Sequence, residues 1–258
     1  MNFAEKFNLQ TPSPGMLTVA WMGQAGFLIK NSRGKVLALD VYLSDLAEKL
    51  DGNKRLTPAL CAPEELAVDL VLATHKHTDH LDLDSIPVWL DRGAHLYCCR
   101  ESEELCIGAG LRRELITAMQ EGGVKEDGGY RIEAVYAEHG DTAPGAVGFM
   151  IESEGIRIYY TGDTSYQQER MKYAAEKEIQ LLLLPINGEY GNMNERDAAM
   201  LAAQVKAAVT VPCHFWTFAR HGGNPYDFLL AMQGLAPDCR SYLMAQGEIL
   251  KITREGIL

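Results

Sequence analysis

The chain has 258 residues, of which 47% are hydrophobic, and its 35 acidic against 24 basic side chains leave a formal net charge of −11. That length is sufficient for one large domain over residues 1–258, and the acidic balance argues against a broad nucleic-acid-binding face. The sequence contains no run of 18 apolar residues that could cross a membrane, and the charges among its first residues argue against a signal peptide. Its six cysteines have no regular spacing, which is typical of reduced thiols, so we expect a cytoplasmic protein.

Strand and helix patterns alternate along the whole chain. Runs rich in Val, Ile, Leu and aromatic residues predict strands, and longer periodic segments with a capping residue such as Asn194 predict helices. The predicted strands are residues 17–21, 27–30, 35–40, 68–73, 95–99, 116–119, 130–137, 147–151, 156–160, 179–185, 209–213, 241–244 and 248–252. The predicted helices are residues 44–50, 63–67, 84–90, 101–107, 167–177, 195–206 and 224–233. This alternation indicates an α/β fold.

The predicted strand 68–73 runs directly into the polar cluster Thr-His-Lys-His-Thr-Asp-His. The cluster holds three of the chain's seven histidines, so a surface loop with incidental histidines is the weaker interpretation. His75 and His77 are two residues apart and project to the same side of an extended backbone, whereas Asp79 and His80 follow a bend. Imidazole and carboxylate groups together suit a divalent metal such as zinc or manganese.

Further histidine and aspartate side chains follow later predicted strands. His139, Asp163 and His214 each come soon after a strand's carboxyl end, which is where an open α/β sheet presents its chemistry. Each of them could instead be an ordinary turn or core residue. Asp40 also ends a predicted strand, where its alternative role is to cap a turn. His95 opens a strand with no acidic or histidine neighbour, so we interpret it as structural.

The pattern His-x-His-x-Asp-His at residues 75–80 resembles the signature of the metallo-β-lactamase superfamily. That resemblance implies a four-layer αββα sandwich of two similar halves, roughly 1–138 and 139–258, with a one- or two-metal site between the sheet edges. It also implies a grouping of the ligands. One metal would be held by His75, His77 and His139, and the other by Asp79, His80 and His214, with Asp163 bridging the two and Asp40 bracing the loop from behind.

Such a ligand set would support hydrolysis. A divalent metal lowers the pKa of bound water from 15.7 towards about 7, which provides hydroxide at neutral pH. Two metals that share a carboxylate would hold that hydroxide and polarise the oxygen of the group under attack, while Asp79 accepts the proton or orients the nucleophile. No cysteine occupies a ligand position, so the nitrogen and oxygen donors fit two ions of manganese, zinc or iron per chain.

Longer stretches are similar to the L-ascorbate-6-phosphate lactonase branch of that superfamily. They are Trp-Met-Gly-Gln-Ala-Gly-Phe-Leu-Ile-Lys at 21–30, the metal motif as far as Asp82, Ala-Val-Gly-Phe at 146–149 and Pro-Cys-His-Phe at 212–215. This resemblance implies a cytoplasmic, manganese-dependent enzyme that opens a phosphorylated sugar lactone such as L-ascorbate 6-phosphate. The alternatives are a phosphodiesterase for a small phosphodiester, a diiron redox protein, and a non-catalytic metal-binding protein.

Other polar and aromatic residues are candidates for binding a substrate. Gln24 lies in the first predicted turn, Tyr190 lies in the loop after the strand 179–185, and three further candidates follow His214. These three are Trp216, Arg220 and His221. An arginine beside the backbone N–H groups of a Gly-Gly pair suits a phosphate group. We therefore expect a small-molecule substrate with no nucleic-acid or membrane partner, and a homo-oligomer is left open.

Overall fold

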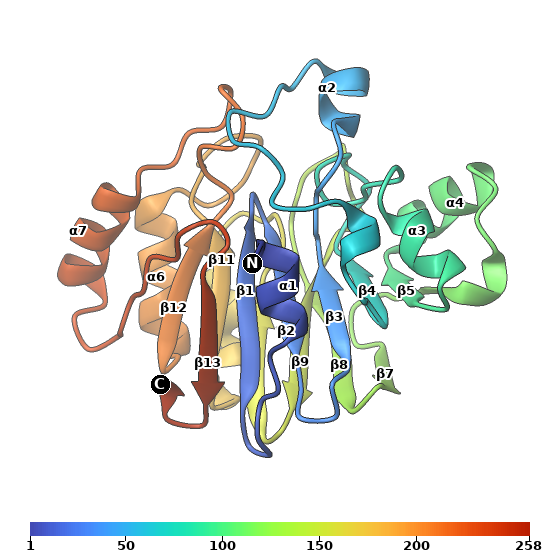
Figure 1. The fold of residues 1–258 in the computed structure, drawn as a ribbon. Helices are drawn as coiled ribbons and strands as arrows, with labels where there is room; N and C mark the ends of the chain where they lie inside the picture. The colour runs from blue at the N-terminus through green and yellow to red at the C-terminus, as the bar shows by residue number, and fades with distance from the viewer.

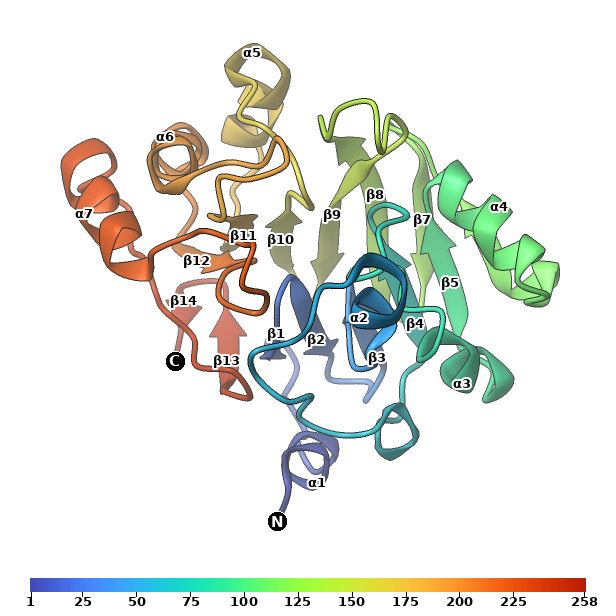
Figure 2. The ribbon, with the colours of Figure 1, turned by 90° about the horizontal axis from the view of Figure 1, so that it is seen from above.

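The computed structural model, which describes residues 1–258, contains two β-sheets that pack face to face with helices on their outer sides (Figure 1, Figure 2). The predicted four-layer αββα sandwich is therefore confirmed. The eight-stranded sheet has the order β14-β13-β1-β2-β3-β4-β5-β6, and the six-stranded sheet has the order β12-β11-β10-β9-β8-β7. The first sheet contains β1 (Leu17–Gly23), β2 (Gly26–Lys30), β3 (Val36–Leu39), β4 (Leu70–Ala73), β5 (His95–Cys98), β6 (Ile116–Ala118), β13 (Ile249–Thr253) and β14 (Gly256–Ile257). The second contains β7 (Val124–Asp127), β8 (Tyr130–Tyr136), β9 (Val147–Ser153), β10 (Ile156–Tyr160), β11 (Leu181–Pro185) and β12 (Val209–Cys213).

Helices cover the outer faces of the sandwich. The helices are α1 (Phe3–Asn8), α2 (Leu46–Asp51), α3 (Ile86–Asp91), α4 (Arg100–Gly108), α5 (Gln168–Met171), α6 (Glu195–Val205) and α7 (Pro225–Leu235), with 3₁₀ helices at Pro63–Glu65, Arg113–Leu115 and Lys172–Glu176. Helix α2 is the exception, because it lies over one end of the sandwich (Figure 1). Figure 2 shows α5, α6 and α7 outside the six-stranded sheet and α3 and α4 beside the eight-stranded sheet. Asn194 caps α6 as predicted, because its side chain accepts a hydrogen bond from the backbone nitrogen of Asp197 at 2.9 Å. None of the helices has the length and apolar character needed to span a membrane.

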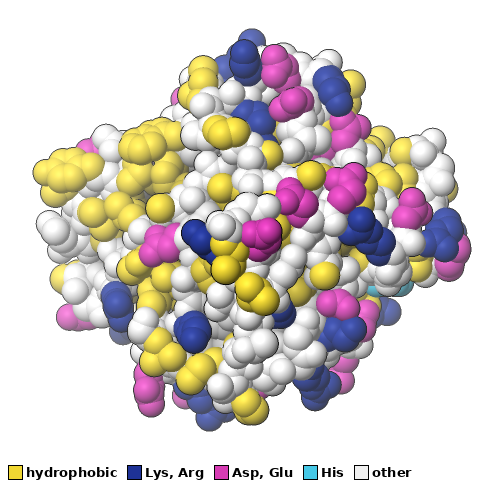
Figure 3. Space-filling model, in the orientation of Figure 1, with side chains coloured by type: hydrophobic (Ala, Val, Ile, Leu, Met, Phe, Trp, Pro, Cys, Tyr) yellow, Lys and Arg dark blue, Asp and Glu magenta, His cyan; other side chains and the backbone are white.

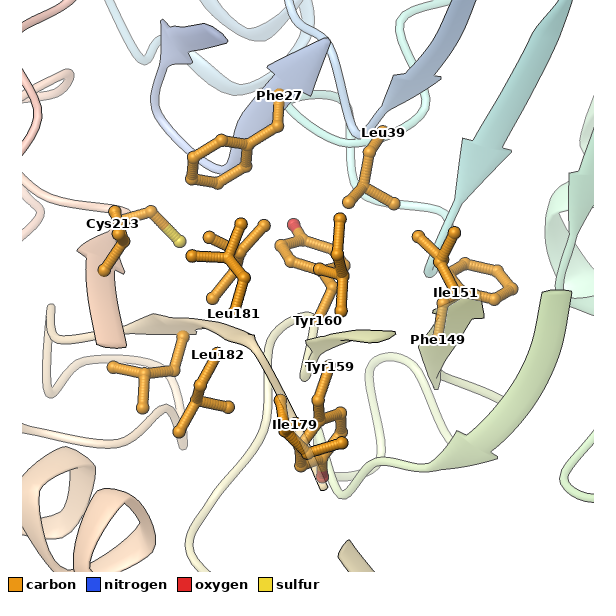
Figure 4. Close-up of a cluster of buried hydrophobic side chains, with 14 of the residues drawn as sticks. Phe27, Leu39, Phe149, Ile151, Tyr159, Tyr160, Ile179, Leu181, Leu182 and Cys213 are labelled. Carbon is orange, nitrogen blue, oxygen red and sulfur yellow. The ribbon is translucent and has the colours of Figure 1, made fainter. Parts of the chain in front are cut away.

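Apolar side chains fill the space between the two sheets (Figure 4). Phe27 and Leu39 of the eight-stranded sheet lie opposite Phe149, Ile151 and Tyr160 of the six-stranded sheet, and all five are fully buried. Burying one such side chain contributes about 1.5–3 kcal/mol. A second apolar layer lies between the eight-stranded sheet and helices α1, α3 and α4. Both faces of the central strands are therefore covered, which explains why β3, β4 and β11 are apolar throughout.

Figure 3 shows one face of the molecule, on which acidic and basic side chains are intermixed. This face therefore carries no continuous basic strip of the kind that a nucleic-acid backbone needs. Apolar side chains gather on the side where α7 lies in Figure 1, and the exposed Tyr226 and Leu230 belong to that helix.

Several elements differ from the sequence prediction. Strand β7 lies outside the predicted strands because its Val-Lys-Glu-Asp sequence is polar, as suits the exposed edge of the six-stranded sheet. The predicted strand 241–244 is wrong, since only an isolated bridge between Ser241 and Thr210 follows the edge of β12. The predicted helix 63–67 is a 3₁₀ turn, and α1 and β14 also lie outside the predicted elements.

The expected halves, 1–138 and 139–258, do not coincide with the two sheets. Strands β7 and β8 precede residue 139 but belong to the six-stranded sheet, and β13 and β14 at the end of the chain belong to the eight-stranded sheet. Leu17 of β1 pairs with Ile252 of β13 in antiparallel register. Because β1 is buried along nearly its whole length, it needs a hydrogen-bonded neighbour on both sides, and the returning chain provides the second one.

Several strands deliver polar residues to the same end of the sandwich, which is the upper end in Figure 1 beneath α2. Strands β3 and β4 are parallel, as are β10, β11 and β12, so the carboxyl ends within each group lie at one sheet edge. Asp40 follows β3, and the histidine motif follows β4. His139, Asp163 and His214 follow β8, β10 and β12. The topology thus gathers residues that are up to 174 positions apart, from Asp40 to His214.

Candidate metal centre

The loop after β4 and the loop after β8 bring a first group of histidines together. His75 is fully buried, and its Nε2 lies 2.9 Å from Nδ1 of His77. His139 places its Nε2 3.2 Å from the same nitrogen of His77. The ring nitrogens of these three residues, which were expected to hold the first metal, therefore converge from strands of two different sheets.

A second group lies beside the first. The Nε2 atoms of His80 and His214 are 3.2 Å apart, and Oδ2 of Asp79 lies 3.5 Å from Nε2 of His214 and 3.7 Å from Nε2 of His80. Both histidine rings are buried, whereas the Asp79 side chain keeps 13% of its surface exposed. Asp79 is therefore the member of this group that a small molecule in solution can reach most easily.

Asp163 lies between the two groups. Its Oδ2 is 3.6 Å from Nε2 of His139 in the first group and 3.2 Å from Nε2 of His214 in the second, and its Oδ1 is 3.4 Å from Nε2 of His80. Asn192 donates a hydrogen bond to Oδ2 at 2.7 Å and fixes the carboxylate plane. One buried carboxylate thus lies against both groups, and it could be shared by two metal ions.

Asp40 lies behind the motif loop and orients it. Its Oδ2 accepts hydrogen bonds from Nδ1 of His80 at 2.7 Å, from Oγ1 of Thr74 at 2.6 Å and from the Tyr160 hydroxyl at 2.7 Å, while its Oδ1 accepts one from the Thr74 backbone at 2.8 Å. A proton held on Nδ1 of His80 leaves the lone pair of Nε2 facing the cluster. This is the arrangement by which a carboxylate orients a metal-binding imidazole.

Strained backbone is concentrated around the site. Gln24, Asp40 and His214 all adopt left-handed conformations, with φ of 51°, 44° and 59°. Such conformations cost about 1–3 kcal/mol each, so the surrounding contacts must hold them in place. The His214 backbone nitrogen donates to the Gln24 carbonyl at 2.9 Å, and the Gln24 nitrogen donates to the Thr217 hydroxyl at 3.1 Å. These bonds fix the two residues relative to one another.

The charged histidine and aspartate side chains of the cluster are stabilised by one another rather than by solvent. Burial lowers the pKa of His75 well below its ordinary value, and the nearby His80 lowers it further. Burial acts in the same direction on His214, but the carboxylates of Asp163 and Asp79 outweigh it and raise the pKa of His214 to about 9. The pKa of Asp163 lies well below its usual range despite burial, because His214 and His80 stabilise its charge.

These residues fit a divalent metal. In the protein alone, the buried carboxylates are neutralised by protons on His80 and His214, whose pKa values are raised for that reason. A divalent cation would supply the same positive charge in place of those protons, and the ring nitrogens that converge at 2.9–3.2 Å could bind it. The donor set contains only imidazole nitrogen and carboxylate oxygen, which suits manganese, zinc or iron.

A cleft of about 220 Å³ opens onto both groups. Its lining consists of Asp51, Asn53, His77, Thr78, Asp79, His139, Thr142, Asp163, Tyr190, His214 and His221. Of the residues expected to bind substrate, Tyr190 and His221 line this cleft. Gln24 is fully buried behind it and donates a hydrogen bond to Oδ2 of Asp79 at 2.7 Å.

Two expected substrate contacts lie elsewhere. Arg220 is exposed, Trp216 is 59% exposed, and neither lines the cleft. In this loop the side chains of Phe215, Thr217 and Phe218 are buried, whereas those of Trp216 and Arg220 are exposed. The assignment of Arg220 as the phosphate-binding residue is therefore not supported by its position.

The structure also shows contacts of site residues that the sequence did not predict. Asn192 contacts Asp163, although no pattern around it distinguishes it from an ordinary loop residue. Asp82, quoted only as part of the motif, accepts hydrogen bonds from the Leu43 and Ser44 backbone nitrogens at 2.9 and 3.0 Å and ties the metal loop to the segment before α2. His221 was expected to contact a phosphate but lies against His214, with ring centroids 4.7 Å apart.

Comparison with known proteins agrees with the fold. The model of the family described as beta-lactamase superfamily domain matches residues 18–214. A UPF0173 metal-dependent hydrolase from Nitratidesulfovibrio vulgaris (strain DP4) is 31% identical over 240 residues, which cover 92% of this chain and 95% of that protein. One from Archaeoglobus fulgidus is 29% identical over 243 residues, which cover 90% and 97%.

Solved structures share the fold at lower identity. A metallo hydrolase from Ignicoccus hospitalis has a TM-score of 0.72 at 24% identity, and the match covers 92% of this chain and 98% of that one. An isothiocyanate hydrolase from Delia radicum gut bacteria has a TM-score of 0.72 at 20% identity, covering 92% and 99%. The fold and the two groups of histidine side chains thus identify the class of this protein as a metallohydrolase. The chain belongs to the metallo-β-lactamase superfamily, and it is a metal-dependent hydrolase.

Proposed function

We propose that this hydrolase opens a lactone or a closely related ester, using two divalent ions, manganese or zinc, held by the two histidine groups. The observation that carries the proposal is the position of Asp163, whose carboxylate contacts both groups at the floor of an open cleft. The similarity of residues 21–30, 146–149 and 212–215 to the lactonase branch supports a carbonyl substrate. Two ions at this site would provide a Lewis acid for the carbonyl oxygen and a water of lowered pKa.

The protein's own residues have separable tasks in this reaction. Asp79 lines the cleft and is the group that takes a proton from the attacking water and returns it to the departing alkoxide oxygen. Gln24 holds the Asp79 carboxylate through the 2.7 Å hydrogen bond from Nε2. Thr142 and Tyr190 lie on the cleft wall, where they orient the ring of the substrate.

The cleft lining favours an uncharged substrate. It contains no Lys or Arg, and Asp51 adds a carboxylate beside Thr78, whose hydroxyl hydrogen-bonds to it. A phosphate on the substrate would have no cationic partner among these side chains and would approach a carboxylate. We therefore propose a compact neutral lactone rather than L-ascorbate 6-phosphate itself.

The test is turnover of matched neutral and phosphorylated lactones, together with a bis-aryl phosphate diester, by protein loaded with manganese, zinc or iron. The proposal expects the highest kcat/KM for the neutral lactones and loss of turnover in Asp79→Asn. A higher kcat/KM for the phosphate diester than for the lactones would replace the lactonase proposal by the phosphodiesterase alternative. The same two histidine groups could support that reaction. Two bound metals without turnover of any of these would favour a binding role.

A further inference from the structure

One of the two histidines that the metallo-β-lactamase pattern leaves unassigned lies inside the metal centre. His221 follows β12 by eight residues, lines the cleft, and stacks on His214 with ring planes 14° apart. The candidate ligand atoms of Asp79, His214 and His221 all lie within 4.8 Å of one another. Ligands of a single ion at about 2.0–2.2 Å from it have separations of that size or smaller.

The Gln24 amide lies at the centre of these three residues. Its Nε2 is 2.7 Å from Oδ2 of Asp79, 3.1 Å from Nε2 of His214 and 3.1 Å from Nδ1 of His221. An amide nitrogen has two hydrogens, so it cannot satisfy three acceptors at once. The Oε1 atom of Gln24 is buried without a hydrogen-bond partner. Two imidazole rings and one carboxylate thus converge on one buried amide group, and a convergent set of nitrogen and oxygen donors of this kind suits a divalent cation.

The His221 ring is held at this place by its own loop. The backbone nitrogen of His221 donates to the carbonyl of Phe218 at 3.1 Å, and the two rings pack edge to face with centroids 4.9 Å apart. The Tyr190 ring lies beside the His221 ring, with the two centroids 5.8 Å apart. The imidazole therefore needs no refolding of the chain to reach the cluster.

We propose that His221 is a ligand of the second metal, in addition to Asp79, His80, His214 and the bridging Asp163. The two positions are then unequal, because the first has only His75, His77, His139 and Asp163. This inference rests on the proposed pair of metals but not on the proposed lactone substrate. It replaces the expectation that His221 binds a phosphate on the substrate.

The test is metal affinity rather than turnover. His221→Ala would be titrated with Mn²⁺ against a competing chromophoric chelator, with His95→Ala as the matched control. His95 is the other histidine outside the motif positions, is half-buried like His221, and hydrogen-bonds to Thr117 at 2.8 Å. Removing even an outer partner of a metal ligand costs about 10–100-fold in affinity, so we expect one of two binding steps to weaken at least tenfold in His221→Ala alone.

Two further measurements separate ligation from packing. Added imidazole should restore the weakened step in His221→Ala, and pulsed EPR of the Mn²⁺ protein should show the loss of one coordinated nitrogen. Unchanged affinities in His221→Ala, or an equal weakening of both steps, would overturn the proposal. If His221→Ala does not fold, His221→Gln takes its place in the same titration. Two intact metal steps without lactone turnover would reject the proposed substrate while leaving this assignment standing.

Discussion

Oδ2 of Asp40 and Nδ1 of His80 are joined by a 2.7 Å hydrogen bond between two side chains that are completely buried. The same carboxylate oxygen accepts the Tyr160 hydroxyl from the opposite sheet at 2.7 Å. One carboxylate therefore couples the orientation of a candidate metal ligand to the packing of the two sheets. Asp40 can do this because it immediately follows β3, where the strand's carboxyl end meets the motif loop after β4.

Asp40→Asn should weaken metal binding without removing a ligand. An asparagine can turn its NH₂ group towards His80, which would then lose the acceptor that keeps its proton on Nδ1. Outer partners of this kind contribute about 10–100-fold to metal affinity, and we expect a loss in that range. The measurement is competition titration with a chelator, and Asp69→Asn is the control because Asp69 binds Lys35 and the Val36 backbone away from the site. Equal affinities for wild type and Asp40→Asn would contradict this role.

Asp163→Asn should reduce metal retention and activity together, because it removes the negative charge shared by both groups. Metal content after desalting and kcat should both fall, whereas the fold should persist because Asn192 can still bond to the new amide oxygen after that side chain rotates. A variant that keeps two metals and normal turnover would show that Asp163 is not the bridge.

The stability of the metal-free protein should decrease as the pH rises from about 6.5 to about 9. The pKa of His214 is raised from its ordinary 6.5 to about 9, so its proton stabilises the folded state fully below 6.5 and no longer does so above 9. Melting temperatures of the chelator-treated protein across this range test the expectation. The metal-loaded protein should show a much weaker dependence, because the cation replaces the proton. A flat profile for the metal-free protein would be the contrary result.

Cys98 and Cys99 should be catalytically silent although both are buried. Cys98 packs on the outer side of the eight-stranded sheet and Cys99 packs between the sheets, and burial raises the pKa of both thiols, so neither is a reactive thiolate. Replacing both by alanine should lower the free energy of unfolding by about 1 kcal/mol per site through lost packing. Reduced kcat at an unchanged melting temperature would disprove this interpretation.

Arg220→Ala should leave kcat, KM and stability nearly unchanged. The side chain is exposed and outside the cleft lining, and substitutions of such residues change stability by about 0.5 kcal/mol or less. Parallel kinetics on a neutral lactone and its phosphorylated counterpart provide the check. A rise in KM confined to the phosphorylated substrate would restore Arg220 as its binding residue and count against a neutral substrate.

The sequence by itself determined the fold class and the position of the metal motif. Both depend on local patterns, since an apolar strand that ends in His-x-His-x-Asp-His specifies its own geometry over a few residues. Asp163 and His214 could be anticipated for the same reason, because each follows a buried strand whose carboxyl end is marked in the sequence.

Only the tertiary structure decided which residues share the site beyond the motif. His214 is fixed by a backbone bond to Gln24, 190 positions earlier, and the same packing places His221 inside the centre and Arg220 outside it. The polar strand β7 and the return of β13 to β1 likewise depend on which edges remain unpaired after the sheets have assembled. Such contacts arise from the closure of long loops, whose outcome depends on the packing of the whole chain rather than on the residues adjacent in sequence.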